Sequence, residues 1–575
     1  MDKALYHLNR ALRKGKRVGA DPFQTLAQYG RGQGKHQFVL LSVAQPNGRA
    51  KVLQAQAATV GEAVALCANS YIDKVNSGDI SQRAEQTIKI DIISYVRPVD
   101  REARVMNPQE RELLLQKQQE GLAIGSELNV AFLPEEVTAY TMLQSKKLQI
   151  EHVLAALPQR LLANEKELAF QLSQAEKLPL YTFRTQAFAL HKNEVKAIEN
   201  GHLLYKEVDA ADLEEAIRYT NDYYFKQVVD EKGKFVYSYL PHKQEVEAKY
   251  NILRHAGTTY SMLETYEFTG DEEVWDEADR AFNYLRAQMK TYHENDQVFR
   301  VVVEKDTMKL GGNALAIIAL AKYVDLSGNK ADLSLMQDLA KYIEYVQDAR
   351  GRFVVHKQTY STGNVINFES HYYPGEAILA LVRLYQLDNN ERWLNVAERA
   401  AAYIIQRRDK DESVDTIAHD HWFLYALNEL YRARPEEMYV RHALFIAEAM
   451  LNKQFTSKEK DGTWYGGYSA SITPPQGTPV ACRSEGLAAT YRLAKDLGLQ
   501  EEANRLYEAV RRGLTFQLQL QVRPETAMYY AEDTKQWGAF QRSFTQLDQR
   551  IDFTQHNISS LLAGREIMIE ASTEK

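Results

Sequence analysis

The sequence predicts an α+β region at residues 1–200, followed by an all-α ring of six helix pairs, an (α/α)6 toroid, at residues 205–575. Two observations lead to this fold class. Before residue 200, short β-like runs alternate with helical runs, whereas from about residue 209 the apolar positions recur at helical spacing. In that second half, helices that are apolar on several faces alternate with amphipathic ones, which are the patterns of buried and peripheral helices.

The N-terminal region is expected to form one domain or two subdomains. Strands at 36–45 and 50–57 flank Pro46-Asn47-Gly48, a strong signal for a hairpin turn. The later elements are expected as a helix at 59–70, a strand at 86–95, a helix near 108–119, an apolar stretch at 122–133, helices near 135–144 and 150–163, and a strand at 180–190. The region has no glycine-rich phosphate loop and no recognisable catalytic spacing, so the sequence assigns it no function.

The second half predicts twelve helices in six hairpins. They are expected at 212–229, 250–268, 272–289, 312–326, 332–347, 371–387, 391–407, 415–431, 436–453, 482–497, 501–520 and 552–568. Tight turns containing Gly270, Gly328, Asn389 and Gly498 close four of the hairpins. Longer links, rich in glycine and aromatic residues, join one hairpin to the next. Because the count stops at six pairs and the two kinds of link alternate, a closed ring is favoured over an open superhelical solenoid.

Composition and charge exclude several classes of protein. The apolar share of 45%, the charged share of 26% and a net charge of −7 are those of a globular protein without a global basic surface for nucleic acid. Two cysteines, Cys67 and Cys482, are too few for a disulfide scaffold or a four-cysteine zinc site. We see neither the apolar block of a signal peptide nor a run long enough to cross a membrane. The expectation is a cytoplasmic protein that needs no metal or cofactor.

Histidines gather where the helices of the inner ring begin. Five of the fourteen histidines fall in these short windows: His255, His371, His419, His421 and His556. In a toroid of this kind the long links lie at the N-terminal ends of the inner helices, so these ends would surround one site. Six helix N-termini aimed at one place favour an anionic ligand. Arg254, Arg483 and Arg550 would add fixed positive charge there.

Carboxylic acids at the same ends suggest acid–base chemistry. The available acids are Glu369, Glu376, Asp415, Asp420, Glu485 and Asp552. Glycoside hydrolysis needs one carboxylic acid and one carboxylate, and Asp420 and Glu485 are the first choice for this pair. The predicted catalytic residues are Asp420, Glu485, His421, His371 and Glu376. The predicted substrate-binding residues are Arg254, His255, Asn313, Tyr373, Trp422, Arg483, Arg550, Asp552 and His556.

Some of these residues also have structural interpretations. Asp415 is equally well placed to cap a helix, and Glu376 to complement a helix dipole in a first turn. Arg550 and Asp552 together favour an ion pair that closes the ring. Tyr219, Tyr223 and Tyr224 have helical spacing on a peripheral helix and are expected to serve packing.

The hairpin at Tyr260–Val274 (YSMLETYEFTGDEEV), echoed at Ile378–Trp393 (ILALVRLYQLDNNERW), and the repeated starts of the inner helices carry a resemblance. Residues 205–570 resemble the six-hairpin glycosidase superfamily, which includes (α/α)6 glycoside hydrolases, unsaturated glucuronyl hydrolases, sugar 2-epimerases and uronyl epimerases. The resemblance implies carbohydrate chemistry. It is architectural, because no short motif selects one family, and it does not extend to residues 1–200.

The leading functional hypothesis is therefore an enzyme that hydrolyses or epimerises an anionic glycan or sugar acid through Asp, Glu and His side chains. The alternative is a non-catalytic toroid that binds a polymer or a protein, for instance as an adaptor in surface polymer assembly. A zinc toroid resembling lanthionine cyclases would need two cysteines and a histidine at the rim, and the sequence offers only Cys482 there. The oligomeric state is left open.

Overall fold

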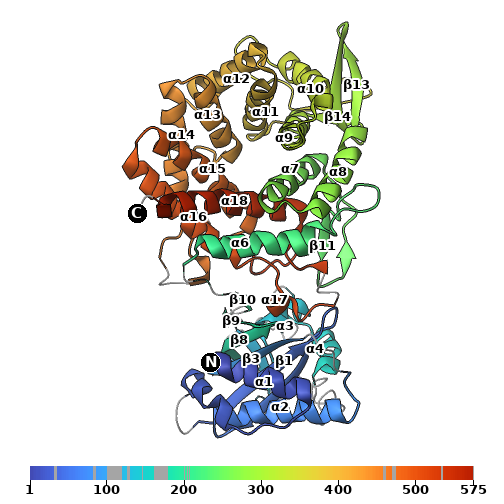
Figure 1. Cartoon of the computed structure of the whole chain (residues 1–575), viewed down its shortest axis with the longest axis vertical. Helices are drawn as coiled ribbons and strands as arrows, with labels where there is room; N and C mark the ends of the chain where they lie inside the picture. Colours follow the sequence, from blue (N-terminus) through green and yellow to red (C-terminus); the bar gives the residue numbers. More distant parts are fainter. Residues whose placement is uncertain are drawn as a thin grey trace, which may run out of the picture.

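The computed structural model has two parts, a small sheet-based domain and a large helical ring (Figure 1). The structure describes residues 1–31, 35–81, 86–99, 120–125, 128, 130–144, 147–160, 179–199, 201–203, 205, 207–457, 462–468, 474–531 and 535–573. The helix predicted near 108–119 and the end of the one predicted at 150–163 lie outside these residues.

The N-terminal domain is built on one antiparallel sheet with the strand order β10-β9-β8-β3-β1-β2. The predicted hairpin is confirmed, because β1 and β2 pair from Gln37↔Ala57 to Val43↔Lys51. The strands β4 and β5 pair with each other, and β4 also joins the edge of β8. The strands are β1 (Gln37–Ala44), β2 (Lys51–Ala57), β3 (Thr87–Pro98), β4 (Gly121–Ile124), β5 (Val130–Phe132), β8 (Leu180–His191), β9 (Glu194–Glu199) and β10 (His202–Leu203).

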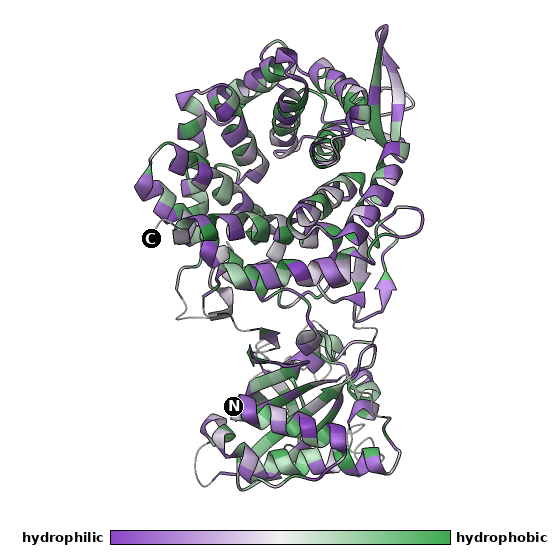
Figure 2. Ribbon diagram, in the orientation of Figure 1, coloured by the Kyte–Doolittle hydropathy of each residue, from purple (hydrophilic) through white to green (hydrophobic). Residues whose placement is uncertain are grey.

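One face of this sheet is covered by helices. The amphipathic α1 (Asp2–Lys14) and α2 (Val60–Asn76) bury their apolar sides with η1 (Asp21–Tyr29) against the strands, which are themselves largely hydrophobic (Figure 2). The side chain of Thr59 accepts a hydrogen bond from the Glu62 amide and that of Glu62 from the Thr59 amide, a capping box that fixes the start of α2.

The helices between β5 and β8 are shorter than predicted. The helix α3 (Pro134–Ala139) ends five residues before the predicted 144, and a small hairpin of β6 (Leu143–Gln144) and β7 (Lys147–Leu148) follows it. Next come α4 (Ile150–Ala156) and the 3-10 turn η3 (Leu157–Gln159). Pro158 lies within that turn and cannot donate the backbone hydrogen bond that would continue a regular helix.

The ring has six inner helices in the described part of the chain. Each packs against the next, and α18 packs against α7, so the predicted closure of the toroid is confirmed (Figure 1). The inner helices are α7 (Ile252–Thr269), α9 (Leu310–Ser327), α11 (Tyr373–Asp388), α13 (His421–Ala433), α15 (Gly477–Asp496) and α18 (Ile551–Thr573). Four of them begin within two residues of the predicted start, whereas α13 begins at residue 421 instead of 415, and α15 at 477 instead of 482.

The outer layer consists of the predicted amphipathic helices. They are α6 (Ala210–Tyr219), α8 (Glu272–Ala287), α10 (Leu333–Tyr345), α12 (Glu391–Tyr403), α14 (Glu437–Leu451) and α16 (Gln500–Leu518). Among the helices in the described ranges, α9 alone is long and apolar enough to cross a membrane, and 72% of that stretch is buried inside the ring. This helix is apolar on all sides because it is surrounded by protein.

The two ends of the ring differ in their connections. At one end, α7 and α9 end at Gly270 and Gly328, whose left-handed φ values of 67° and 66° allow the chain to reverse sharply. At the other end the long links form short strands that the sequence did not predict. They are β11 (Ser238–Leu240), β12 (Glu245–Val246), β13 (Met289–Glu294), β14 (Gln297–Glu304), β15 (Thr307–Lys309), β16 (Lys357–Thr359) and β17 (Gln549–Arg550).

The last long link of the ring, with α17 (Pro524–Ala527), docks on the N-terminal domain (Figure 1). Met528, Tyr529 and Trp537 bury their side chains against the sheet face that α1 and α2 leave uncovered. The Ala50 amide donates to the Met528 carbonyl at 2.6 Å, and the hydroxyls of Ser42 and Tyr529 lie 3.0 Å apart. The two domains therefore share an apolar core across their interface.

Candidate active site

The N-terminal ends of four inner helices bring a cluster of polar side chains together at the mouth of the ring. We call these residues the mouth cluster: Glu376 from α11, Asp420 and His421 at the start of α13, Cys482 and Glu485 from α15, and His556 from α18. Glu376, Asp420, His421 and Glu485 are almost fully buried. Four of the six were predicted as catalytic residues, although no sequence pattern showed that they meet.

His556 forms the centre of the cluster. Its Nδ1 lies 2.8 Å from Oε1 of Glu485, and its ring also shares a hydrogen bond with the Cys482 thiol. Burial by itself would lower the pKa of His556, but the neighbouring Cys482 and Glu485 raise it well above its ordinary value. These two neighbours thus favour the protonated form of His556, although burial also raises the pKa of Glu485 to about 7.

His421 has the opposite character. Its side chain is 4% exposed, and neither ring nitrogen has a hydrogen-bond partner among the described residues. Burial, together with the positive charges of His556 and Arg483, lowers the pKa of His421 well below its ordinary value. The rings of His421 and His556 meet edge to face with centroids 5.2 Å apart, and Trp422 packs on His421 at 4.9 Å. The two facing imidazoles thus have pKa values shifted in opposite directions.

The two carboxylate oxygens of Asp420 have different surroundings. Its Oδ1 accepts the Phe423 amide at 3.1 Å and caps α13. Its Oδ2 is buried and finds no hydrogen-bond partner within the described ranges. Burial raises the pKa of Asp420 to about 7, against the lowering effect of Arg408. The N-cap of α13 is thus Asp420, and Asp415 is an exposed residue paired with Lys453 at 3.1 Å.

Glu376 is a buried acid in the first turn of α11. Its Oε2 has no hydrogen-bond partner in the described part of the chain. Burial and the nearby Asp420 raise the pKa of Glu376 to about 8, so it is mostly protonated at neutral pH. A methyl group at Gly311 would lie 2.3 Å from this oxygen, so the backbone of α9 passes directly against the acid.

Two arginines share one aspartate beside the cluster. Arg254 donates from Nε to Asp552 at 2.9 Å and from Nη1 to the Tyr237 hydroxyl at 2.7 Å. Arg550 donates to both oxygens of Asp552, at 2.5 and 2.9 Å. Burial opposes ionisation of Asp552, but these guanidinium groups hold its pKa below the usual value. The unit carries a net positive charge at the junction of α7 and α18.

Other predicted residues lie away from the mouth cluster. His371 is exposed, and so is Glu369, which pairs with Arg352. His255 and Asn313 are fully buried within the fold. The ring of His255 bonds the Tyr250 hydroxyl and the Ala281 carbonyl, while Asn313 bonds the backbone at residues 302 and 309. Both therefore hold loops in place and do not reach the mouth.

Three residues predicted to bind substrate lie close to the mouth cluster and make contacts with neighbouring side chains. Arg483 donates from Nε to Nδ1 of His419 at 2.8 Å and lies over the Tyr468 ring. Trp422 is buried between His421, Tyr425 and His556. Tyr373 is half-buried at the start of α11, and burial together with Glu376 raises the pKa of its hydroxyl.

Sequence reasoning missed a second polar layer deeper in the ring. Ser559 donates to Glu264 at 2.5 Å, and Arg383 donates to Glu429 at 2.9 Å. Tyr425 hydrogen-bonds Glu485 and so links this layer to the mouth cluster. A signal was present in the sequence, because a charged residue such as Arg383 inside an apolar inner helix needs a buried partner.

The cluster also has a donor set suited to a metal ion. One ligand atom from each of His421, Cys482, Glu485 and His556 lies within 4.8 Å of all the others. Two imidazoles, a thiolate and a carboxylate are ligands that Zn²⁺ accepts in four-coordinate sites. The sequence suggested only Cys482 for such a site, because the two histidines come from other helices, α13 and α18.

Comparison with known proteins concerns the ring alone. No family model matches the sequence, and no curated protein matches it. Similar solved structures include a D-mannose isomerase (15% identity, TM-score 0.47, covering 62% of this chain and 97% of that one). Others are the cellobiose 2-epimerase of Spirochaeta thermophila DSM 6192 (14%, 0.46, 63% and 97%) and an unsaturated glucuronyl hydrolase specific for heparin (12%, 0.45, 63% and 97%).

Proposed function

We propose that the ring mouth moves a proton between carbon atoms, or between faces of one carbon, in an anionic sugar, as a sugar isomerase or epimerase does. The observation that carries this proposal is the pair of facing histidines. Neutral His421 and cationic His556 have pKa values shifted in opposite directions in one buried site. Two titratable groups separated in this way supply a general base and a general acid.

The reaction follows from these two states. In an open-chain sugar, His421 removes the proton from the carbon next to the carbonyl, and the electron pair forms the double bond of an enediol. His556 gives its proton to the carbonyl oxygen, and Glu485 holds the imidazole in position during the transfer. Return of the proton to the opposite face of the same carbon, while the first hydroxyl of the enediol gives its proton back to His556, gives an epimer. Return of the proton to the former carbonyl carbon, while the second hydroxyl gives its proton to His556, gives an isomer.

The positive charge beside the cluster supports an anionic substrate. Arg254 and Arg550 share the single carboxylate of Asp552, and each guanidinium has five N–H donors, more than these contacts use. The N-termini of the inner helices add their partial positive charges at the same end of the ring. A carboxylate or phosphate on the sugar would bind there through charge-assisted hydrogen bonds.

Hydrolysis is the second candidate function, and Glu376 is the residue that favours it. Of the two acids first predicted for hydrolysis, Glu485 pairs with His556, whereas Asp420 caps α13 with one oxygen and keeps the other unbonded among the described residues. Glu376, with a pKa of about 8 and an unbonded oxygen, has the properties of a general acid. Its partner in that reaction would be the free oxygen of Asp420.

The deciding experiment is hydrogen exchange in D₂O. Glucuronate, galacturonate and mannuronate are incubated with the enzyme, and NMR follows loss of the proton at C2 together with formation of new sugars. The proposal expects exchange with at least one of them, and His421→Asn and His556→Asn should each lower its rate by about 10²–10⁴-fold. His293→Asn, at an exposed position on β13, is the matched control.

Other outcomes contradict the proposal in distinct ways. Cleavage of a glycoside that depends on Glu376, without exchange at C2, would establish hydrolysis. Stoichiometric zinc in the purified protein would make His421 and His556 ligands and remove them as acid and base. Wild-type rates in both histidine variants would place the chemistry elsewhere.

A further inference from the structure

We propose that the cavity between the two domains is a second sugar-binding subsite, which takes an acidic sugar unit joined to the sugar in the ring mouth. This inference rests on the proposed function and extends it to the length of the substrate. It gives the N-terminal domain a role as one wall of the substrate site.

The cavity has a volume of about 760 Å³, within the range of sites that bury small ligands. On the N-terminal side its wall is formed by Val137 and Thr138 from α3 and by Thr141 and Leu143 just after it. On the ring side the wall contains the start of α7, with Tyr250, Asn251 and Arg254, and residues 542–550 before α18. Each domain therefore supplies part of the wall of one half-open cavity.

Arg254 connects this cavity with the mouth cluster. It lines the cavity, and its partner Asp552 lies on α18 one helical turn before His556. The charge of Arg254 also lowers the pKa of the Tyr373 hydroxyl, which lies beside Glu376. A ligand whose carboxylate meets Arg254 can thus place one end at the histidines and the other in the cavity.

The lining has the chemistry of a site for an acidic carbohydrate. The lining contains four cations (Arg254, Arg542, Arg550 and Lys249) and three acids (Glu120, Glu247 and Asp548), so it carries one excess positive charge. The rings of Tyr237 and Tyr250 also line the cavity and have apolar faces of the kind on which sugars stack. Hydroxyl and amide groups for sugar hydroxyls come from Thr138, Thr141, Asn251, Thr545 and Gln546.

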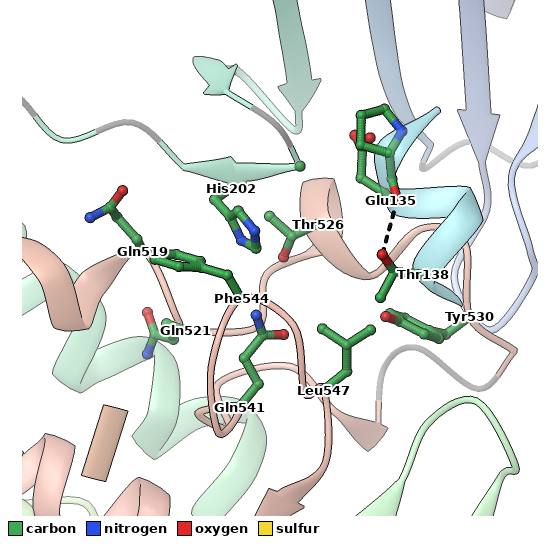
Figure 3. A pocket seen from close by; sticks show the side chains of 12 residues that line it. Glu135, Thr138, His202, Gln519, Gln521, Thr526, Tyr530, Gln541, Phe544 and Leu547 are labelled. Atoms are coloured by element: carbon green, nitrogen blue, oxygen red, sulfur yellow. Dashed lines mark hydrogen bonds between the residues drawn. The ribbon is translucent and has the colours of Figure 1, made fainter. Parts of the chain in front are cut away.

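The interface narrows on the far side of Thr138 and Leu547, which line both this cavity and a smaller pocket. Figure 3 shows Thr138 from α3, Leu547 and Gln541 from the ring link, and His202 from β10 pointing into that smaller space. It holds only about 30 Å³, the volume of about one water molecule. Because this smaller space has little room for a sugar, the proposed occupant of the larger cavity is one or two sugar units, not a polymer threaded through the interface.

Binding measurements on the full chain test this inference. The probes are uronic-acid disaccharides (digalacturonate, dimannuronate, diguluronate and cellobiouronate) and the corresponding monosaccharides, measured by isothermal titration calorimetry. We expect at least one disaccharide to bind more tightly than its monosaccharide. Lys249→Glu should weaken binding of that disaccharide by up to about fivefold, the effect of a solvent-exposed charge, and leave binding of the monosaccharide unchanged.

Lys243→Glu is the matched control, because it makes the same charge change in the same exposed link but does not line the cavity. Thr141→Trp provides a second test that fills the space from the N-terminal side, and it should also weaken only the disaccharide. Circular dichroism and thermal unfolding confirm that each variant is folded.

The inference is overturned if disaccharides and monosaccharides bind equally, if none of the probes binds, or if Lys249→Glu and Lys243→Glu behave alike. Failure of the proposed reaction looks different. If disaccharide binding depends on Lys249 but no exchange occurs at C2, the proposed subsite stands and the proposed isomerase or epimerase reaction is wrong. Exchange that depends on His421, with no effect of Lys249→Glu, would retain the reaction and reject the subsite.

Discussion

Gly311 shows how closely single residues are fitted around the mouth cluster. A Cβ added there would lie 2.3 Å from Oε2 of Glu376 and 2.5 Å from the Tyr373 ring, well inside van der Waals contact. We expect Gly311→Ala to displace the acid, to lower kcat, and to cost about 1–3 kcal/mol of unfolding free energy through overpacking. Steady-state kinetics and urea unfolding would measure both effects.

Gly312→Ala is the control for that prediction. The added methyl group would meet Leu253 at 3.5 Å, an ordinary contact, and should leave kcat and stability nearly unchanged. If both variants changed kcat and unfolding free energy to the same extent, the close approach of α9 to Glu376 would not affect function.

Glu376 also predicts how stability changes with pH. Its pKa rises from 4.5 to about 8 on folding, so the folded state holds a proton that the unfolded state releases. The contribution of this group to stability is full below pH 4.5 and is lost as pH rises through 8. We expect Glu376→Gln, which removes the ionisation, to gain stability relative to wild type between pH 5 and 8.

Thermal unfolding at several pH values measures this effect. The difference in Tm between Glu376→Gln and wild type should increase steadily with pH. A difference that is constant across the range would mean that Glu376 ionises as freely in the folded chain as in the unfolded one.

Sequence alone could identify the mouth cluster only in part. His255, His421 and His556 all lie near the start of an inner helix, and nothing in the pattern separates them. In the structure His255 bonds the Ala281 carbonyl, whereas His421 has bare nitrogens facing His556. The direction of each side chain depends on helix rotation and on neighbours distant in sequence, which periodicity does not contain.

At the scale of elements, two substitutions at the N-cap of α13 distinguish the structural role of Asp420 from its role in the reaction. Asp420→Ala removes the oxygen that accepts the Phe423 amide and should cost about 0.5–2 kcal/mol. Asp420→Asn keeps an oxygen in that place, so its free energy of unfolding should lie within a few tenths of a kcal/mol of the wild-type value. Chemical denaturation of both variants gives the comparison, and equal losses would contradict the capping role.

The elements themselves were predicted best where their pattern was long. The inner helix α9 is apolar on all sides over 18 residues and leaves no alternative to a buried helix. Five of the strands in the long links have only two or three residues, which carry no measurable periodicity. The longer hairpin of β13 and β14 was also missed. The start of α13 was placed six residues early, since Asp415 and Asp420 are equally good caps by type and only the fold selects one.

At the scale of the whole molecule, the shared core between the domains predicts a single cooperative unfolding. Met528 is fully buried against the N-terminal sheet. Met528→Asp would place an unpaired charge there, and we expect it to undock the domains and split the transition into two in scanning calorimetry. Met528→Leu, which keeps apolar volume, should retain one transition.

Two transitions in the wild-type protein would contradict this expectation. So would a single unchanged transition in Met528→Asp, because it would show that the interface adds nothing to cooperativity.

The last link of the ring has a consequence for the order in which the chain matures. The sheet of the N-terminal domain is complete once β10 has left the ribosome, yet part of its second face is covered by residues of the last link, among them Met528, Tyr529 and Trp537. The ring, too, closes only when α18 meets α7. Throughout synthesis of more than three hundred intervening residues, the nascent chain therefore exposes an apolar sheet face, a surface that chaperones recognise and that makes premature release prone to aggregation.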